Sequence, residues 1–247
     1  MDRLAYVAMT GARQTEIAQS INSNNLANVS TTGFRADLHA FSHQQIEGTG
    51  QQTRVNAIAE RYATDFRQGS IISTGRDLDI AIQGEGFIAV QAPDGSEAYT
   101  RAGDLRVQSG GILTTGTGLP VIGDGGPVAI PPSANLLIGG DGTVSVQPLG
   151  QSAETTAAVD RIKLVKPDSA DLVKGNDGLF RLASGDQADA DAAVTVVSGS
   201  IEQSNVNVAS TLVNMIELAR QYEMQINVIQ TARDDADTAA SLLRISG

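Results

Sequence analysis

The chain has 247 residues, with 17 Lys and Arg against 28 Asp and Glu, a formal net charge of −11 and no Cys. Its length allows one large domain or two small ones, and the lack of Cys excludes disulfides, thiolate metal sites and Cys nucleophiles. The negative balance disfavours nucleic acid and anionic membranes as partners, because binding either one requires basic residues. No apolar run approaches the roughly 18 residues of a membrane span, and the start, MDRLAYVAMTGARQTE, turns polar early. We therefore expect a soluble chain without a cleaved signal peptide.

Residues 1–36 are predicted to hold a helix and the turn that ends it. Gly11 is the one helix breaker in the first 32 residues, and Gly33 is suited to a positive φ at the end of the turn. Two seven-residue rows run along this helix: Leu4, Gly11, Ala18 and Asn25, and Val7, Gln14, Ile21 and Asn28. Because many members are small or polar, this stripe is expected to pack against a stronger partner rather than to fold alone.

The middle of the chain is predicted to be an extended connector over residues 37–80, followed by a β domain over 81–198. Between Gly84 and Gly199 lie 19 of the 26 Gly, and all seven Pro lie between Pro93 and Pro167. Short apolar runs such as Phe87 to Gln91 alternate with turn signals such as Pro93-Asp94-Gly95. This spacing favours an antiparallel sandwich or barrel.

Residues 199–247 are predicted to contain a long C-terminal helix, because residues 200–246 lack Gly and Pro. Its rows are Leu212, Ala219, Ile226, Arg233 and Ala240, and Met215, Tyr222, Ile229, Ala236 and Leu243. A helix over about 207–243 would be roughly 55 Å long, with Ser204, Asn205 or Asn207 as its cap. The fold class predicted is α+β, a central all-β domain flanked by long terminal helices that pair in a coiled-coil-like manner.

Three patterns resemble binding sites, one for a dinucleotide and two for metal ions, but the residues around each pattern do not fit such a site. Gly84 to Ala89 matches GxGxxA with Asp104 about 20 residues later, but a dinucleotide site needs a helix where FIAVQAPDG indicates a strand and a turn. His39, His43 and Glu47 would share a helical face, yet HExxH needs Glu at position 40, which is Ala. Asp186, Asp189 and Asp191 lack the Gly and Glu of an EF-hand. No enzyme activity, cofactor, metal site or small-molecule substrate is predicted.

Motifs near both ends and in the middle indicate one protein family. Ser23 to Phe34 resembles the signature NNLANxxTxGF, and Gly199 to Asn207 resembles GxLExSNV. Gly84 to Phe87 and Tyr99 to Gly103 resemble GxGFF and YTRxG, although Ile88 replaces the usual second Phe. The chain thus resembles the flagellar axial proteins, the rod and hook family of bacterial flagella.

The resemblance implies a structural subunit of the flagellar basal-body rod, exported uncleaved by the flagellar type III apparatus into a periplasm-spanning, torque-transmitting helical tube. The start and the run Met215 to Met224 are most similar to the proximal-rod type. A distal-rod or hook-type protein is the alternative within the family, and a monomeric soluble binding module is the alternative outside it. The implied partners are other copies of the chain and other rod proteins.

Terminal helices that pair within a subunit leave their other faces for neighbouring copies, and a head-to-tail contact that does not close produces a helical filament. The residues expected at this assembly interface lie on the helical rows and in the two terminal motifs. They are Leu4, Val7, Gly11, Ile21, Asn24, Asn25, Leu26, Ala27, Asn28, Ser204, Asn205, Val206, Leu212, Met215, Ile216, Ala219, Tyr222, Ile226 and Ile229.

Overall fold

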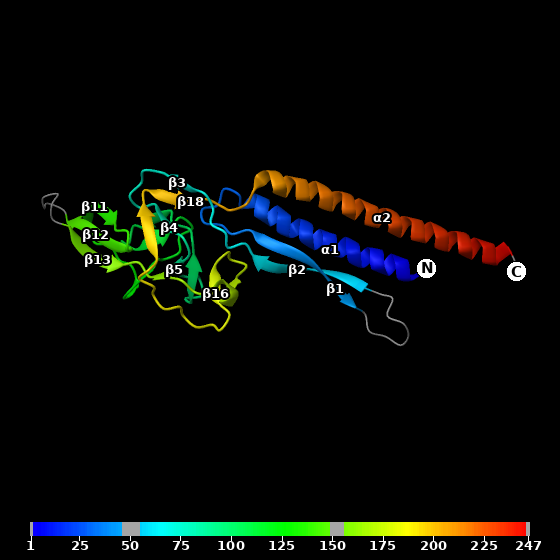
Figure 1. Cartoon of the computed structure of the whole chain (residues 1–247), viewed down its shortest axis with the longest axis horizontal. Coiled ribbons are helices and arrows are strands. Elements are labelled where there is room, and N and C mark those ends of the chain that lie inside the picture. Colours follow the sequence, from blue (N-terminus) through cyan, green and yellow to red (C-terminus); the bar gives the residue numbers. More distant parts are fainter. Residues whose placement is uncertain (1, 46–54, 149–155, 246–247) are drawn as a thin grey trace. The chain divides into compact units, whose positions relative to one another are not determined.

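The computed structural model describes residues 2–45, 55–148 and 156–245, and it has one helix at each end of the chain with strands between them (Figure 1). The chain forms two compact units. The first comprises Met1–Asn28, Ala36–Asp65 and Val206–Gly247, and the second comprises Val29–Arg35 and Phe66–Asn205. Neither described helix has an apolar stretch long enough to cross a membrane.

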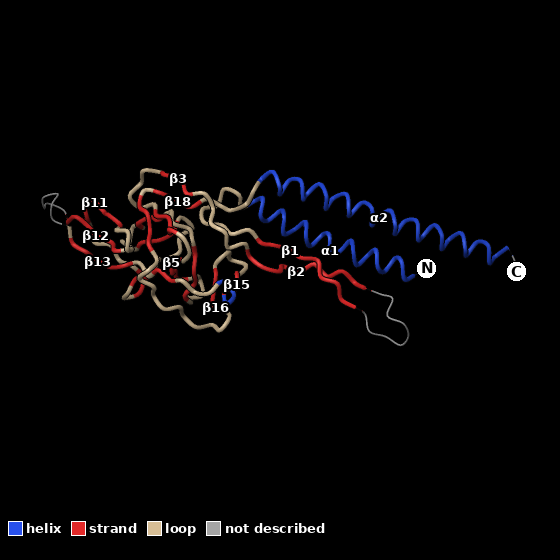
Figure 2. Tube along the Cα trace, in the orientation of Figure 1, coloured by secondary structure: helices blue, strands red, loops and turns tan. Residues whose placement is uncertain are grey.

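The first unit is built from the helices α1 (Asp2–Ala27) and α2 (Val208–Ile245) and the antiparallel strands β1 (Asp37–Gln45) and β2 (Val55–Thr64). Helix α1 contacts both α2 and the β1–β2 pair, and thus lies between them (Figure 2). Of the three predicted caps, Asn207 begins α2, since its Oδ1 accepts a hydrogen bond from the Ser210 amide at 3.1 Å. The range 37–80, predicted as an extended connector, contains β1, β2 and β3 (Ile71–Ser73).

The buried residues of α1 are small or polar, which lets the helix backbone approach its neighbours closely. They are Ala8, Ala12, Thr15, Ala18, Asn22 and Asn25. Asn25 joins α1 to β1, because its Nδ2 donates to the Asp37 carbonyl and its Oδ1 accepts from the Asp37 amide, both at 2.8 Å. One buried side chain thus holds both polar backbone groups of the first residue of β1.

The second unit is built from short antiparallel strands. Its largest sheet has the order β14-β5-β6-β16-β15, and smaller sheets are β11-β12-β13, β17-β4, β18-β3, β7-β8 and β10-β9. The bounds are β4 Ile80–Gln83, β5 Phe87–Gln91, β6 Glu97–Thr100, β7 Leu105–Val107, β8 Leu113–Thr115, β9 Ile122–Gly123, β10 Gly126–Pro127, β11 Ser133–Ile138, β12 Thr143–Pro148, β13 Ala157–Arg161, β14 Leu164–Val165, β15 Leu172–Lys174, β16 Phe180–Leu182, β17 Thr195–Ser198 and β18 Ser200–Glu202, with a 3₁₀ turn at Ser169–Asp171. All the strand pairs in the described ranges are antiparallel, as predicted.

The five-stranded sheet is apolar on both faces. Successive side chains of a strand point to opposite sides, so a run of apolar residues places apolar groups on each side. In β5, Ile88 and Val90 belong to one apolar cluster, while Phe87 and Ala89 belong to another. The first cluster also takes in residues of β4, β8, β12 and β17, so the small sheets share this core with the large one. This explains why the first four residues of β5, FIAV, are all apolar instead of alternating with polar residues.

Replacing Ile88 with Ala is expected to destabilise the second unit by about 2–5 kcal/mol, because Ile88 is fully buried and the change leaves a cavity. Thermal and urea unfolding of the full chain measure the loss. Val173→Ala, at an exposed position of β15, serves as the control, with an expected change within about 0.5 kcal/mol. Equal losses in the two variants would contradict this assignment of the core.

Replacing Asn25 with Ala is expected to weaken the attachment of β1 to α1 by about 1–3 kcal/mol, because two buried hydrogen bonds to Asp37 are lost. Amide hydrogen exchange at Asp37 is the measurement, and it should become faster by at least about tenfold. Asn24→Ala, one residue earlier and exposed, is the control. An unchanged exchange rate in Asn25→Ala would show that these hydrogen bonds do not hold the strand.

Candidate assembly interface

The two terminal helices run antiparallel and contact each other through polar as well as apolar groups. The Asn22 Nδ2 donates to the Thr211 carbonyl at 2.8 Å, near the end of α1 and the beginning of α2. Thr15, further toward the chain start, lies by Gln225, further toward the chain end, with 3.3 Å between the Thr15 Oγ1 and the Gln225 Nε2. A Cβ on Gly11 would lie 3.0 Å from the same Nε2. The pair is therefore close, and its contact is formed largely by small and polar side chains.

The most deeply buried positions of both helices are displaced by one residue from parts of the predicted rows. On α1 the buried row is Ala8, Thr15 and Asn22, where Val7, Gln14 and Ile21 were expected. On α2 it is Thr211, Leu218 and Ala232, where Leu212 and its row were expected. For α1 the reason is geometric, since it packs against two neighbours, α2 and the β1–β2 pair, and is buried over a wider arc than a two-helix contact requires.

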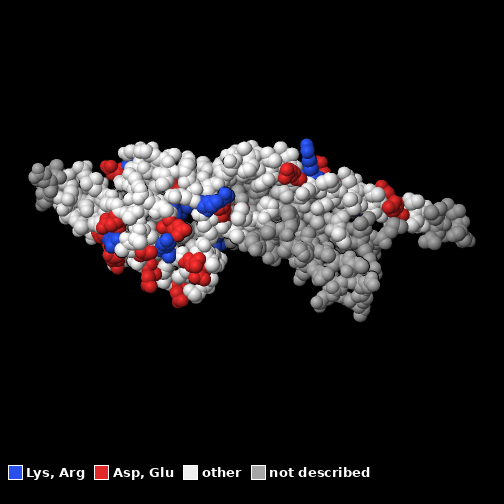
Figure 3. Space-filling model, in the orientation of Figure 1, with Lys and Arg blue, Asp and Glu red and all other residues white. Residues whose placement is uncertain are grey.

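Large apolar side chains remain exposed on both helices as a result. On α1 they are Tyr6, Val7 and Met9, and on α2 they are Val208, Leu212, Val213, Ile216, Tyr222, Met224 and Val228. Ile216 and Met224 are 56% and 59% exposed. Charged side chains are sparse along the face of α2 turned toward the viewer in Figure 3. Such a density of exposed apolar residues on a helix is typical of a surface that another protein covers.

The structure distributes the predicted interface residues over three environments. Exposed are Val7, Asn24, Ala27, Leu212, Ile216 and Tyr222. Partly buried are Gly11, Ile21, Leu26, Asn28, Ser204, Asn205, Val206, Met215, Ala219, Ile226 and Ile229. Asn25 is buried against Asp37, and Leu4 lies on α1 with a side chain outside the described set. The side chains of the first group are therefore accessible to another protein.

The patterns rejected in the sequence occupy ordinary structural positions. Gly84 and Gly86, with φ of 74° and 138°, form the bend between β4 and β5, and a strand begins where a dinucleotide site would need a helix. His39 and His43 lie on the strand β1, and Glu47 is outside the described residues. Asp186, Asp189 and Asp191 lie in a loop, and no cluster of three potential metal ligands occurs in the described parts of the chain.

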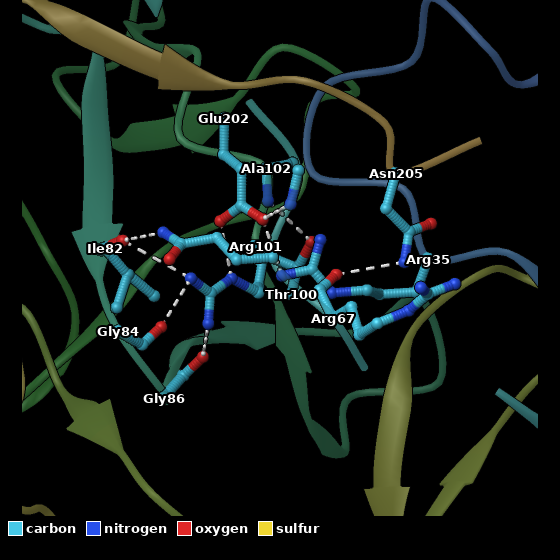
Figure 4. A network of polar contacts seen from close by, with 12 residues as sticks. Arg35, Arg67, Ile82, Gly84, Gly86, Thr100, Arg101, Ala102, Glu202 and Asn205 are labelled. Carbon is cyan, nitrogen blue, oxygen red and sulfur yellow. Dashed lines mark hydrogen bonds and ion pairs between the residues drawn. The ribbon is translucent and has the colours of Figure 1, made fainter. Parts of the chain in front are cut away.

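Sequence reasoning missed a buried charge cluster in the second unit (Figure 4). The Glu202 carboxylate contacts two guanidinium groups, with 2.6 Å from its Oε1 to the Arg35 Nη2 and 2.7 Å from its Oε2 to the Arg101 Nε. All three side chains are at most 4% exposed. A signal was available, because Arg101 and Glu202 lie in motifs that resemble the rod and hook family and Arg35 directly follows a third such motif.

The two arginines of this cluster differ in how their hydrogen bonds are satisfied. Arg101 also donates to the carbonyls of Gly86 and Gly84, both at 2.9 Å, and of Ile82. Arg35 is held by its ion pair with Glu202, since its Nε, Nη1 and Nη2 have no hydrogen-bond partner within the described residues. Burial lowers the pKa of the Arg101 guanidinium, the Glu202 carboxylate raises it, and the neighbouring Arg35 lowers it. One carboxylate thus balances two buried positive charges.

Three family profiles match successive parts of the chain. The profile described as "Flagella basal body rod protein" matches residues 6–35, which cover most of α1 and the segment after it. The profile "Flagellar hook protein FlgE/F/G D1 domain" matches residues 81–146 in the second unit. The profile "Flagellar basal body rod FlgEFG protein C-terminal" matches residues 197–242, from β17 through most of α2.

Proteins similar over the full length carry the same description. The chain is 43% identical to the flagellar basal-body rod protein FlgF of Escherichia coli K12, and 40% identical to FlgF of Salmonella typhimurium LT2, with 100% of each chain covered in both comparisons. The flagellar basal-body rod protein FlgG of Bacillus subtilis 168 is 28% identical, with 99% of this chain and 100% of the relative covered. On these similarities, the chain belongs to the flagellar basal-body rod and hook protein family.

Proposed function

We propose that the chain is a structural subunit of the bacterial flagellar basal-body rod, of the proximal-rod type. The similarity to two FlgF proteins over their whole length supports this assignment. The FlgG proteins have lower identity, with 33% for FlgG of Buchnera aphidicola subsp. Schizaphis graminum over 92% of this chain, so the distal-rod alternative has less support. The relatives named here are rod proteins, which agrees with a structural and not an enzymatic role.

The subunit is proposed to assemble through its terminal helices, and one observation carries this point. The outward faces of α1 and α2 present large apolar side chains, among them Val7, Leu212 and Ile216, that no described part of the chain covers. Helices whose small residues face each other can pair in a coiled-coil-like manner, with their large residues directed to neighbouring copies. Repeating such a contact without closure produces a helical tube.

The partners in this proposal are other copies of the chain and other proteins of the proximal and distal rod. A tube of paired helices that spans the periplasm would carry motor torque along its axis, because adjacent subunits bury apolar surface against each other. The chain would reach this place through the flagellar type III export apparatus without cleavage of a signal peptide. Nucleic acid and small-molecule substrates have no place in this function.

Replacing Ile216 with Asp is expected to block incorporation into the rod while leaving the monomer folded. The side chain is 56% exposed in the chain, so the monomer should lose no more than about 0.5 kcal/mol. In an assembled interface the unpaired carboxylate would cost on the order of several kcal/mol per subunit. The amount of variant in purified basal bodies, from a strain without its own copy, and swimming in soft agar are the measurements.

Val173→Asp is the matched control, since it makes the same change at an exposed apolar position of the second unit. It should be incorporated nearly as well as the unchanged chain. Equal failure of both variants would refute an interface specific to the terminal helices. Absence of even the unchanged chain from basal bodies would favour the alternative of a monomeric binding module.

A further inference from the structure

The buried charge cluster of the second unit includes residues that are close in sequence to the points where the chain enters or leaves that unit. The chain leaves or enters the second unit at residues 28–29, 35–36, 65–66 and 205–206. Arg35 and Glu202 are at or near two of these crossings, and Arg67 is near a third. The second unit therefore begins or ends, along the chain, at three segments. They are 29–35, 66–70 and 202–205.

Hydrogen bonds join these three segments to one another. The Gly33 amide donates to the Glu202 carbonyl at 2.8 Å, and the Gly69 amide donates to the Glu202 Oε1 at 2.8 Å. The Gln203 amide donates to the Ser70 carbonyl at 2.8 Å. Glu202 thus contacts segment 29–35 through its backbone and its side chain, and segment 66–70 through its side chain.

Further bonds at the edge of the cluster repeat this connection. The Asn205 amide donates to the Phe34 carbonyl at 3.3 Å, and the Asn205 Nδ2 donates to the Arg67 carbonyl at 3.0 Å. Asn205 therefore joins the same pair of segments that Glu202 joins, by contacts of its own.

Segment 29–35 is also held against the body of the second unit. The Lys174 Nζ donates to the Arg35 carbonyl at 2.7 Å and lies 4.0 Å from the centre of the Phe34 ring. At Gly33, where φ is 67°, a Cβ would lie 2.3 Å from the carbonyl carbon of Arg101. The backbone thus approaches residue 101 so closely that only glycine fits, which places Arg35 beside the carboxylate that Arg101 already contacts.

We propose that Glu202, as the counter-ion shared by Arg35 and Arg101, is a clamp that makes segments 29–35, 66–70 and 202–205 order together. The physical reason is the charge balance. Arg35 is buried and has Glu202 as its one ion-pair partner among the described residues, so the segment that carries it docks only when Glu202 is in place. Glu202 is in place only when β18 has paired with β3, which directly follows segment 66–70.

The clamp predicts that a change in one segment loosens the others. Arg35→Met keeps a long side chain and leaves Glu202 paired with Arg101, so the second unit should fold. Amide hydrogen exchange of the full-length chain should become about tenfold faster at Gly33, and also at Gly69 and Gln203, which are more than 30 residues away in sequence. Exchange at Ala89 and Gln91, whose amides are hydrogen-bonded in the sheet core, should stay unchanged.

Lys166→Met is the control, because it removes a Lys from an exposed ion pair with Glu85, 3.0 Å long and with side chains 48% and 82% exposed. It should leave exchange at Gly69 and Gln203 unchanged within about twofold. Faster exchange in Arg35→Met that is confined to residues 29–35 would overturn the proposal. So would faster exchange at Ala89 and Gln91 to the same extent, since that indicates general unfolding.

A second comparison tests the shared counter-ion. Glu202→Gln leaves two buried guanidinium groups without a carboxylate and should accelerate exchange at Gly69 and Gln203 more than Arg35→Met does. Adding Arg35→Met to Glu202→Gln should slow that exchange again, because it removes one of the uncompensated charges. Additive effects would show that the two side chains act independently. If Glu202→Gln does not fold, the Arg35→Met measurement decides by itself.

Discussion

The carboxylate of Glu202 lies between two buried guanidinium groups, and this pairing constrains the arrangement of the second unit. Charges are costly to bury unless their partners are in contact, so Arg35, Arg101 and Glu202 must meet although they come from widely separated parts of the sequence. Three features bring these side chains into contact. They are the close approach of Gly33 to Arg101, the pairing of β18 with β3, and the bend between β4 and β5, where Gly86 accepts a hydrogen bond from Arg101. In the proposed clamp, these three charges hold segments 29–35, 66–70 and 202–205 together.

The first unit depends on a different constraint, which is the small size of the residues on α1. Ala8, Ala12 and Ala18 allow α1 to fit between α2 and the β1–β2 pair, and Asn25 satisfies backbone groups of β1. Small side chains contribute little apolar area. Leu218 of α2 is buried, but other large apolar residues of both helices, such as Val7 and Ile216, are exposed. In the proposed assembly, this division leaves the exposed apolar residues of both helices available for neighbouring subunits.

Local chemistry determined much of the fold. The absence of Gly and Pro from 200–246 predicted a helix over about 207–243, and α2 spans Val208–Ile245. The run FIAVQ predicted β5. The seven-residue rows were less informative. Periodicity indicates that a helix has a contact face, but it does not indicate how many other elements pack against that helix. The β1–β2 pair was missed as a second neighbour of α1. Ala18 and Asn25 of the predicted rows are buried, but Ala8, Thr15 and Asn22 are buried one residue away from the other predicted row.

The sequence by itself determined the terminal helices, the short antiparallel strands and, through four motifs, the resemblance to the flagellar rod and hook family. These features depend on residues close together in the chain, where propensity and turn chemistry act. Only the tertiary structure decided which carboxylate Arg35 and Arg101 share, that Asn25 contacts Asp37, and which apolar side chains stay exposed. The partner of a charged or amide side chain depends on how distant segments pack together. The residues next to it in the sequence therefore do not indicate which group it will contact.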